Sequence, residues 1–318
     1  MRVAMFSRLM LIAAGAALIA SCHGDGGPKH PKPPKGPTAI CSIPQGEKPI
    51  DFYLSYAADS NRYLYTISEL DSGVANFFTY YKYRANQQTI ELDTPNQSLR
   101  VQDLVDMYNL LKQNQSLGYN PSYDYAALKM SVGMDGKKVL LIFEPVVLKP
   151  TAEDSNLCTI TSSCSYFKSQ PSASMIVLDS ASALELVNSL CSPMSPIYID
   201  HPANPEIHTF INSDGPDGDT RSMIMTFQEI FGMYCANVTT PSMADRINFT
   251  IAANQMEPQG NFKMHVVVNY KIGQNSPAIN TFTGDGADYS TNCPTHCDII
   301  NILKDPNSVY ENPHHSGR

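Results

Sequence analysis

Residues 128–147 read LKMSVGMDGKKVLLIFEPVV, and this stretch decides the fold. Its first half alternates apolar residues with polar or small ones from Leu128 to Met134. Asp135-Gly136 follows, and an Asp-Gly pair between two such runs predicts a β-hairpin with a two-residue turn. Val139–Phe143 is apolar on both faces, which predicts a strand in the interior of a sheet.

A second hairpin is expected near the C-terminal end. Apolar residues alternate with polar ones from Ile247 to Ala253 and again from Phe262 to Tyr270, on either side of an expected loop at Gln255–Gly260. One face of each strand is apolar and the other polar, which is typical of an antiparallel sheet that covers a core.

The remaining pattern mixes strands and helices. Helices are expected over Val101–Leu111, starting near Thr94 or Ser98, and over Ser182–Leu190, where Ser182 to Glu185 fits a capping box. Thr220–Tyr234 fits a helix or a strand, and we favour the helix. Further strands are expected at Ile50–Tyr56, Arg62–Ser68, Ala75–Arg84, Met175–Leu178 (buried) and Ile197–Ile199. Without regular βαβ alternation, the sequence predicts an α+β fold with hairpin-rich antiparallel sheets and two to four helices, in one or two lobes.

The first 22 residues have the layout of an export signal. Arg2 and Arg8 precede an apolar and small-residue run, Leu9–Ala20, which ends in Ile19-Ala20-Ser21-Cys22. This ending resembles the lipobox of bacterial lipoproteins. The resemblance implies cleavage before Cys22 and acylation of that cysteine by chains such as palmitate, which together anchor a protein stably. The alternatives are an ordinary secretory signal and, less well supported, a single membrane-spanning anchor.

The lipoprotein resemblance also bears on location. Cys22 is followed by His23 rather than by an aspartate, which by analogy favours the outer membrane over the inner one. The sequence leaves open which face of the membrane would carry the protein.

Composition then divides the rest of the chain. His23–Thr38 reads HGDGGPKHPKPPKGPT, and such a Pro-, Gly- and Lys-rich stretch predicts an extended tether. The expected organisation is a signal peptide (1–21), a lipidated cysteine with its tether (22–38), an N-terminal α+β lobe (39–150), a polar connection (151–172), a C-terminal α+β lobe (173–303) and a loose tail (304–318).

The net charge limits the class of partner. The whole chain carries −8; without Arg2 and Arg8 it carries −10, and without the net +2 of His23–Thr38 the body carries −12. Nucleic-acid binding needs clustered Lys and Arg, so nucleic acid is not an expected partner. The expected partners are a membrane, reached through the lipid anchor, and an envelope protein or a glycan.

Disulfides are the default expectation for cysteines of an exported chain. With Cys22 lipidated, seven of the eight cysteines remain. The near pairs would be Cys158–Cys164 and Cys293–Cys297, Cys191–Cys235 would close a long loop, and Cys41 would be left over. Six cysteines allow 15 pairings, so other connectivities remain open.

Two stretches carry possible metal ligands. Cys293-Pro-Thr-His-Cys297 could hold Cu(I) or Zn(II) through its thiolates, although a disulfide is the simpler interpretation. Asp214, Asp217 and Asp219 lie in a Gly-rich run that suits calcium, yet Asp and Gly are also ordinary turn residues. Neither alternative leads us to expect a metal or another cofactor.

Three functions remain open. The favoured one is a non-enzymatic, lipid-anchored binding or assembly module of a bacterial envelope, where a surface of Tyr80, Tyr81 and Tyr83 could contact a glycan. The second is a lipid-anchored hydrolase that uses acidic residues or His201, beside Asp200, in a cleft. The third is a metal-handling protein centred on Cys293 and Cys297. No catalytic motif favours the second over the first.

Overall fold

The computed structural model describes residues 64–65, 67–85, 88–90, 96–152, 157–170, 174–191, 197–199, 222–228, 230–231, 244–256, 261–272, 286–287, 291–293 and 299–301. All of them lie in one compact unit, Lys35–Arg318. The α-helices in these ranges are α3 (Ile67–Tyr80), α4 (Val101–Gln113) and α5 (Ser180–Cys191), and a 3-10 helix, η2, spans Gln115–Leu117.

The strands fall into three sheets. A five-stranded sheet has the order β1 (Leu64–Tyr65), β14 (Gly286–Ala287), β13 (Asn261–Ile272), β12 (Ala244–Met256) and β4 (Asn96–Arg100). An eight-stranded sheet has the order β15 (Thr291–Cys293), β11 (Ser222–Thr226), β5 (Tyr125–Asp135), β6 (Lys138–Pro150), β7 (Leu157–Ser162) and β16 (Ile299–Asn301), and β8 (Tyr166–Lys168) joins it to β9 (Ile176–Leu178). The third sheet contains β10 (Ile197–Ile199), β2 (Tyr81–Ala85) and β3 (Gln88–Ile90). With α3, α4, α5 and antiparallel sheets among the described residues, the fold is α+β, as the sequence predicts.

The first predicted hairpin is confirmed. β5 pairs with β6 along its whole length, from Tyr125 opposite Leu148 to Asp135 opposite Lys138. The two-residue turn is Gly136-Lys137, one residue later than the predicted Asp135-Gly136 turn, because Asp135 pairs with Lys138 as the last residue of β5. Gly136 has φ +62°, a left-handed conformation that glycine adopts without steric cost. β6 has β5 on one edge and β7 and β8 on the other, so Val139–Phe143 lies inside the sheet, as its two apolar faces predict.

The second hairpin is confirmed as well. β12 pairs with β13, and the last pair is Met256 opposite Asn261, so the strand continues slightly beyond the expected start of the loop at Gln255. β4 pairs with the other edge of β12. These strands provide the inner face of the five-stranded sheet.

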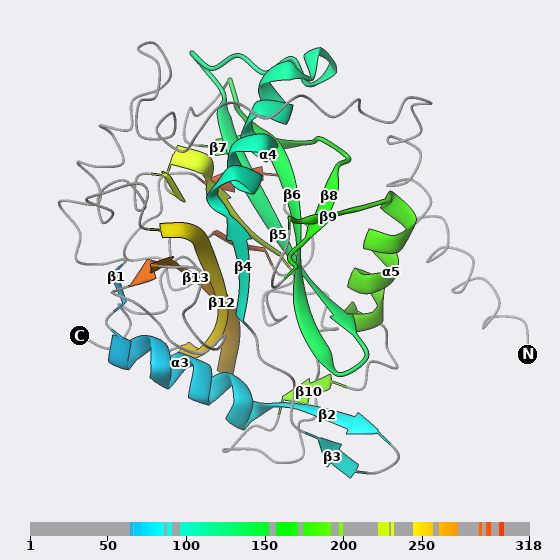
Figure 1. The fold of residues 1–318 in the computed structure, drawn as a ribbon, viewed down its shortest axis with the longest axis vertical. Helices are drawn as coiled ribbons and strands as arrows, with labels where there is room; N and C mark the ends of the chain where they lie inside the picture. The colour runs from blue at the N-terminus through cyan, green and yellow to red at the C-terminus, as the bar shows by residue number, and fades with distance from the viewer. Residues whose placement is uncertain are drawn as a thin grey trace, which may run out of the picture. The chain divides into compact units, whose positions relative to one another are not determined.

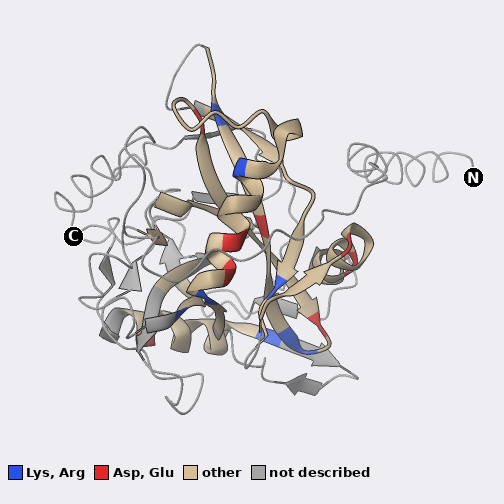
Figure 2. Ribbon diagram, turned by 45° about the horizontal axis from the view of Figure 1, so that its top comes forward, with Lys and Arg blue, Asp and Glu red and all other residues tan. Residues whose placement is uncertain are grey.

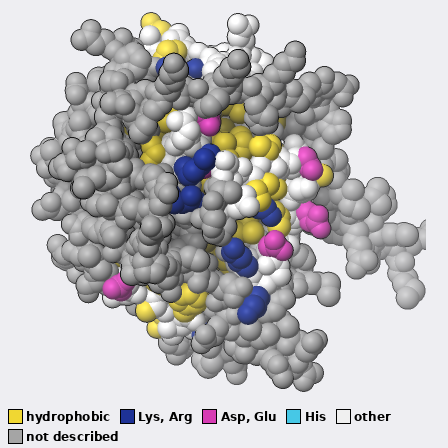
Figure 3. Space-filling view, viewed as in Figure 1, with side chains coloured by type: hydrophobic (Ala, Val, Ile, Leu, Met, Phe, Trp, Pro, Cys, Tyr) yellow, Lys and Arg dark blue, Asp and Glu magenta, His cyan; other side chains and the backbone are white. Residues whose placement is uncertain are grey.

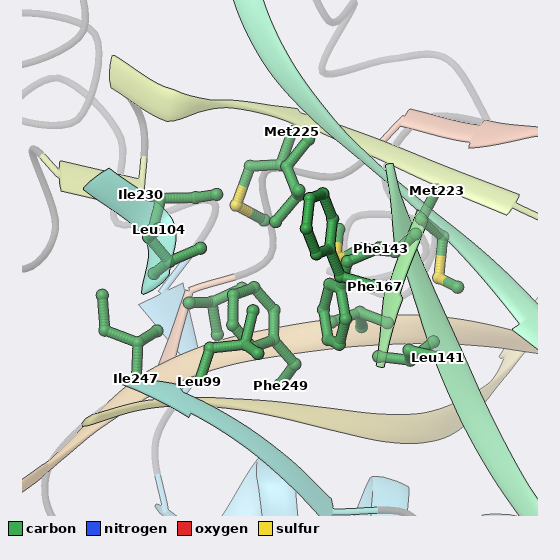
Figure 4. Close-up of a cluster of buried hydrophobic side chains, with 14 of the residues drawn as sticks. Leu99, Leu104, Leu141, Phe143, Phe167, Met223, Met225, Ile230, Ile247 and Phe249 are labelled. Carbon is green, nitrogen blue, oxygen red and sulfur yellow. The ribbon is translucent and has the colours of Figure 1, made fainter. Parts of the chain in front are cut away.

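The main core lies between the two large sheets (Figure 4). Phe143 of the eight-stranded sheet meets Phe249 of the five-stranded sheet edge-on, with ring centroids 5.1 Å apart. Leu104 of α4 is fully buried in the same cluster. Burial of such side chains contributes about 25 cal/mol per Å² of apolar surface, which makes this cluster the main stabilising feature of the fold.

One helix packs on the outer face of each large sheet (Figure 1). α3 buries Leu70 against Ala252 and Val267 of the five-stranded sheet. α5 buries Ala183 against Leu140 and Ile142 of the eight-stranded sheet. α3, the two large sheets and α5 therefore form four layers: helix, sheet, sheet and helix.

The strand predicted over Ala75–Arg84 is wrong for its first half, and that over Arg62–Ser68 for its end, because α3 runs from Ile67 to Tyr80. Leu70, Val74, Phe77 and Tyr81 recur at helical spacing and face the sheets, which outweighs the β-propensity of the aromatic residues. Tyr81 is 1 % exposed and stacks on Phe77 with ring centroids 5.1 Å apart. The expected glycan-binding surface of Tyr80, Tyr81 and Tyr83 therefore lacks its central ring.

Three other expectations need correction. Within Thr220–Tyr234, Ser222–Thr226 forms strand β11, because Met223 and Met225 point into the core at a period of two. The described residues after it, 227–228 and 230–231, are helical. The helix expected from Thr94 or Ser98 begins at Val101, since 96–100 pairs with β12 as β4. Met175–Leu178 was expected to be buried, but β9 leaves Val177 50 % exposed.

Other expectations are met in part. α5 covers the helix predicted at Ser182–Leu190, but its cap is Asp179, whose carboxylate accepts a hydrogen bond from the Ser182 amide at 2.7 Å. The strand at Ile197–Ile199 is present as β10. β11, from the expected C-terminal lobe, pairs with β5, from the expected N-terminal lobe, so the described strands of both lobes share one sheet. Ile50–Tyr56 lies outside the described residues.

Candidate functional site

A polar cluster interrupts the outer face of the eight-stranded sheet. We define the Glu144 cluster as Lys129 of β5, Glu144 of β6, Ser162 of β7 and Tyr166 of β8. On the same face, one apolar group lies around Val146 and Ile224, and another lies under α5 around Ile142. The cluster is therefore the place in the described part of this face where titratable and hydroxyl side chains meet.

Glu144 is the centre of the cluster. It is 4 % exposed, and burying a carboxylate costs several kcal/mol unless it is paired and hydrogen-bonded. The Ser162 hydroxyl donates a hydrogen bond to Glu144 Oε1. Lys129, directly opposite on β5, places Nζ 3.6 Å from Glu144 Oε2. Each carboxylate oxygen therefore has a partner.

Tyr166 completes the cluster. Burial raises the pKa of Tyr166 to about 12, and the negative charge of Glu144 acts in the same direction, because both disfavour a phenolate. A hydrogen bond with Ser162 acts the opposite way and is the weakest of the three causes. Tyr166 is therefore a neutral phenol at physiological pH.

The cluster lies where the edge of the sheet changes from β7 to β8. Ser162 pairs with Val146 and Phe167 pairs with Phe143, so four residues, 163–166, lie opposite only two, Glu144 and Pro145. A proline has no backbone N–H to give to the ladder, which is why it occurs in sheets at such interruptions. The extra residues form a bulge. Glu144 of β6 interacts with Ser162 of β7 before the bulge and lies near Tyr166 of β8 at its end.

The bulge has a defined backbone. The Cys164 amide donates a hydrogen bond of 2.9 Å to Ser162 Oγ, and Cys164 has φ +54°, the one positive value among the described non-glycine residues. The Ser165 amide donates to Ser163 Oγ at 3.3 Å. Ser162 thus donates to the buried Glu144 carboxylate and accepts from the Cys164 amide in the turn. The turn sets the position of β8, and β9 pairs with β8.

Two arginines on the five-stranded sheet make hydrogen bonds and an ion pair within the protein. Arg246 and Arg100 lie directly opposite each other on β12 and β4. Arg100 makes a two-pronged contact with Asp103, at 2.5 and 3.1 Å, and Arg246 donates to the Ser98 and Gln170 carbonyl oxygens at 2.8 and 3.1 Å. Figures 2 and 3 show that the described residues include charges of both signs on several elements.

The near pairing of Cys158 with Cys164 is wrong. Cys158 lies in β7, pairs with Pro150 and is fully buried. From there the chain continues along β6 in one direction to Phe167, so Cys164 lies beyond Ser162, too far for the Cα separation of about 4.4–6.8 Å that a disulfide requires. Cys164 is disulfide-bonded, and that bond does not use Cys158.

Most residues singled out from the sequence lie elsewhere. Cys191 ends α5 and Cys293 ends β15, and these two elements lie in the same α+β unit. Outside the described residues are Cys22, Cys41, Asp200, His201, Asp214, Asp217, Asp219, Cys235 and Cys297.

Two general features of the described part of the chain complete the survey. It contains no group of three or more His, Cys, Asp or Glu side chains arranged to hold a metal ion. None of its helices has the length and apolar character needed to cross a membrane.

The sequence contains a signal for the Glu144 cluster that motif searching misses. Glu144-Pro145 interrupts the apolar run Val139–Val147 in a strand that the pattern already places inside a sheet. A charge at such a position requires a partner, and a proline there indicates a bulge. The identity of the partners, Lys129 and Ser162, follows only from the register of the three strands.

Compared with known proteins, the chain matches no protein-family model, no curated protein and no solved structure. The functional inference therefore comes from the residues of the chain itself.

Proposed function

We propose that this protein is a lipid-anchored component of a bacterial cell envelope, with the outer membrane favoured, and that its folded body is a non-enzymatic binding or assembly module. The observation that carries the proposal is the run Leu9–Ala20 followed by Ser21-Cys22. Several acyl chains on Cys22 would contribute about 0.8 kcal/mol per buried methylene, enough for a stable anchor.

The arrangement of the chain supports the same proposal. The composition of His23–Thr38 predicts an extended tether, and all the described residues follow it in sequence. The body beyond the tether has a large apolar core of its own, between two sheets. A domain with such a core could act at a distance from the lipid headgroups.

The arrangement of the Glu144 cluster supports a binding rather than a catalytic role. The Glu144 carboxylate is taken up by Ser162 and Lys129, and the Cys164 amide donates to Ser162. These contacts shape the sheet edge that leads to β8 and β9. A fixed edge of this kind suits recognition of a partner chain.

The test is membrane fractionation of cells that express matched cysteine variants. Wild-type protein and Cys41→Ser should both sediment with membranes and resist extraction by high salt. Cys22→Ser should move to the soluble fraction or remain with its uncleaved signal. Equal sedimentation of mature Cys22→Ser and wild-type protein would overturn the proposal.

A second candidate, a lipid-anchored hydrolase, is favoured by one contact. Ser162 is exposed and donates to a buried carboxylate that Lys129 orients, which has the form of a nucleophile, a base and an orienting group. A fluorophosphonate would then react at Ser162: Oγ bonds to phosphorus, its proton passes to Glu144 and fluoride leaves. Labelling of wild-type protein but not of Ser162→Ala would support this candidate, with Ser116→Ala as the control. Absence of labelling of wild-type protein would reject it.

A further inference from the structure

β9 forms an open edge among the described strands. It pairs only with β8, through Ile176 opposite Lys168, Val177 opposite Phe167 and Leu178 opposite Tyr166. The backbone groups on the far side of β9 therefore have no described strand as a neighbour. Such an edge presents a row of N–H and C=O groups that can template another strand.

β9 and the helix after it carry exposed apolar side chains, and Ile176 and Val177, as neighbours in a strand, lie on opposite faces of this edge. Ile176 is 38 % exposed, Val177 is 50 % exposed, and Leu184, in the helix that follows β9 directly, is 39 % exposed. Tyr123 is the other large apolar side chain exposed in the described ranges. Three of these four thus lie between Ile176 and Leu184, in β9 and the first half of α5.

α5 packs against β9 and fixes its position. Leu178 packs in one cluster with Ala183 and Leu186 of α5. Asp179 accepts hydrogen bonds from the Ser182 amide at 2.7 Å and the Ser182 hydroxyl at 3.1 Å, which fixes the link between strand and helix. The exposure of Ile176 and Val177 is therefore a property of an anchored strand, and a partner would bind it with little ordering cost.

We propose that the β9 edge binds one extended peptide segment of another envelope protein by adding it to the sheet as a strand, with apolar side chains beside Ile176 and Val177. This assignment rests on the proposed binding role and names its partner class. Main-chain hydrogen bonds supply affinity in this mode, and alternate side chains supply specificity.

The area and the charge favour this occupant. Three partly exposed aliphatic side chains are a small part of the about 800 Å² per partner that a stable pair of folded proteins buries, so a second copy of the chain is the poorer fit. Lys168 lies opposite Ile176 on β8, Asp179 directly follows β9 and Glu185 lies in α5, so the charges of these three residues sum to −1. The bound segment should therefore carry a basic residue next to its apolar ones.

The test uses the full chain in detergent micelles and a fluorescent peptide with the sequence Lys-Val-Thr-Val-Thr-Val-Lys. Fluorescence anisotropy should show saturable binding to wild-type protein. A copy of the peptide with alternate amide nitrogens methylated should bind at least tenfold more weakly, because it cannot complete the ladder. Absence of saturable binding to wild-type protein, or equal affinity for the methylated and unmethylated peptides, would overturn the proposal.

Matched variants locate the binding. Val177→Lys should weaken binding at least tenfold, whereas Tyr123→Lys, which places the same charge at the other exposed apolar residue, should leave it unchanged. Val177→Thr keeps a β-branched side chain and should retain most of the affinity, which guards against a folding defect in Val177→Lys. Equal binding by wild-type protein and a folded Val177→Lys would contradict the assignment.

Two further outcomes separate this assignment from other possibilities. A molar mass that doubles with concentration for wild-type protein but not for Val177→Lys would assign the edge to a second copy and overturn the peptide assignment. Failure of peptide binding together with Cys22-dependent fractionation would reject the β9 assignment alone. Peptide binding without Cys22-dependent fractionation would instead reject the lipid anchor.

Discussion

Lys129 and Glu144 lie directly opposite each other on β5 and β6, with Lys129 Nζ 3.6 Å from Glu144 Oε2. Glu144 is buried, whereas Lys129 keeps about a third of its side chain in solvent. A partly exposed lysine, Lys129, therefore neutralises the buried carboxylate of Glu144. The pair lies at the bulge between β7 and β8, so loss of the ion pair is expected to disturb the edge of the sheet there.

Lys129→Met should destabilise the protein by about 2 kcal/mol, because it leaves a buried carboxylate with Ser162 as its partner. The effect stays below that of a fully buried pair, since Lys129 is partly solvated. The free energy of unfolding in urea measures it.

The controls for this prediction are one exposed lysine and one double variant. Lys138→Met, on an exposed lysine of the same hairpin, should change stability by less than about 0.5 kcal/mol. Adding Glu144→Gln to Lys129→Met should recover part of the loss, because the uncompensated charge is gone. Equal effects of Lys129→Met and Lys138→Met would show that the ion pair contributes nothing.

Tyr166→Phe should reduce the decline in the free energy of unfolding that wild-type protein shows at alkaline pH. The pKa of Tyr166 is raised to about 12 in the folded protein, against about 10 in an unfolded chain. Its contribution is therefore fully present below pH 10 and is lost as the pH rises toward 12. Urea unfolding between pH 9 and 12 should show a smaller decline for Tyr166→Phe than for wild-type protein. Tyr123→Phe is the control and should follow wild-type protein; if Tyr166→Phe does so as well, Tyr166 is not linked to folding in this range.

Gly133→Ala should displace α5 and cost about 1–3 kcal/mol. A Cβ at Gly133 would lie 3.0 Å from the Leu186 carbonyl oxygen and 3.1 Å from its carbon, both of them backbone atoms that cannot rotate away. Hydrogen exchange of the α5 amides should accelerate in this variant. Gly136→Ala is the comparison: it strains a residue with φ +62°, but its Cβ would meet nothing within 4 Å, so α5 should keep its protection. Unchanged exchange in Gly133→Ala would mean that α5 does not pack closely on β5.

Phe249→Ala should cost about 3–5 kcal/mol, because it empties part of the core between the two large sheets. Thermal unfolding measures the loss, with Tyr123→Ala, at a residue that is 68 % exposed, as the control. A loss below 1 kcal/mol would contradict the face-to-face packing of the sheets at Phe143 and Phe249.

The elements that the sequence predicts best are those with local signals. Asp135-Gly136 locates the turn to within one residue, the alternation before it predicts β5, and the apolar run after it predicts β6 as an interior strand. β12 and β13 are also predicted from a local pattern, because apolar residues alternate with polar ones over much of their length. These pairings need no information from distant parts of the chain.

The errors arise where tertiary packing decides. Residues 77–83 are rich in aromatic side chains of high β-propensity, yet Phe77 and Tyr81 belong to a longer helical period that begins at Leu70. Met223 and Met225 fit both periods, and pairing of β11 with β5 selects the strand. The partners of Glu144 depend on strand register, which no single segment contains.

The most direct test of the central claim is the mass of the N-terminal peptide from protein isolated from membranes. A lipid-anchored protein predicts a peptide that begins at Cys22 and carries thioether- and amide-linked acyl chains. A peptide that begins at Cys22 or later with an unmodified thiol, or a mature chain that retains residues 1–21, would contradict the account.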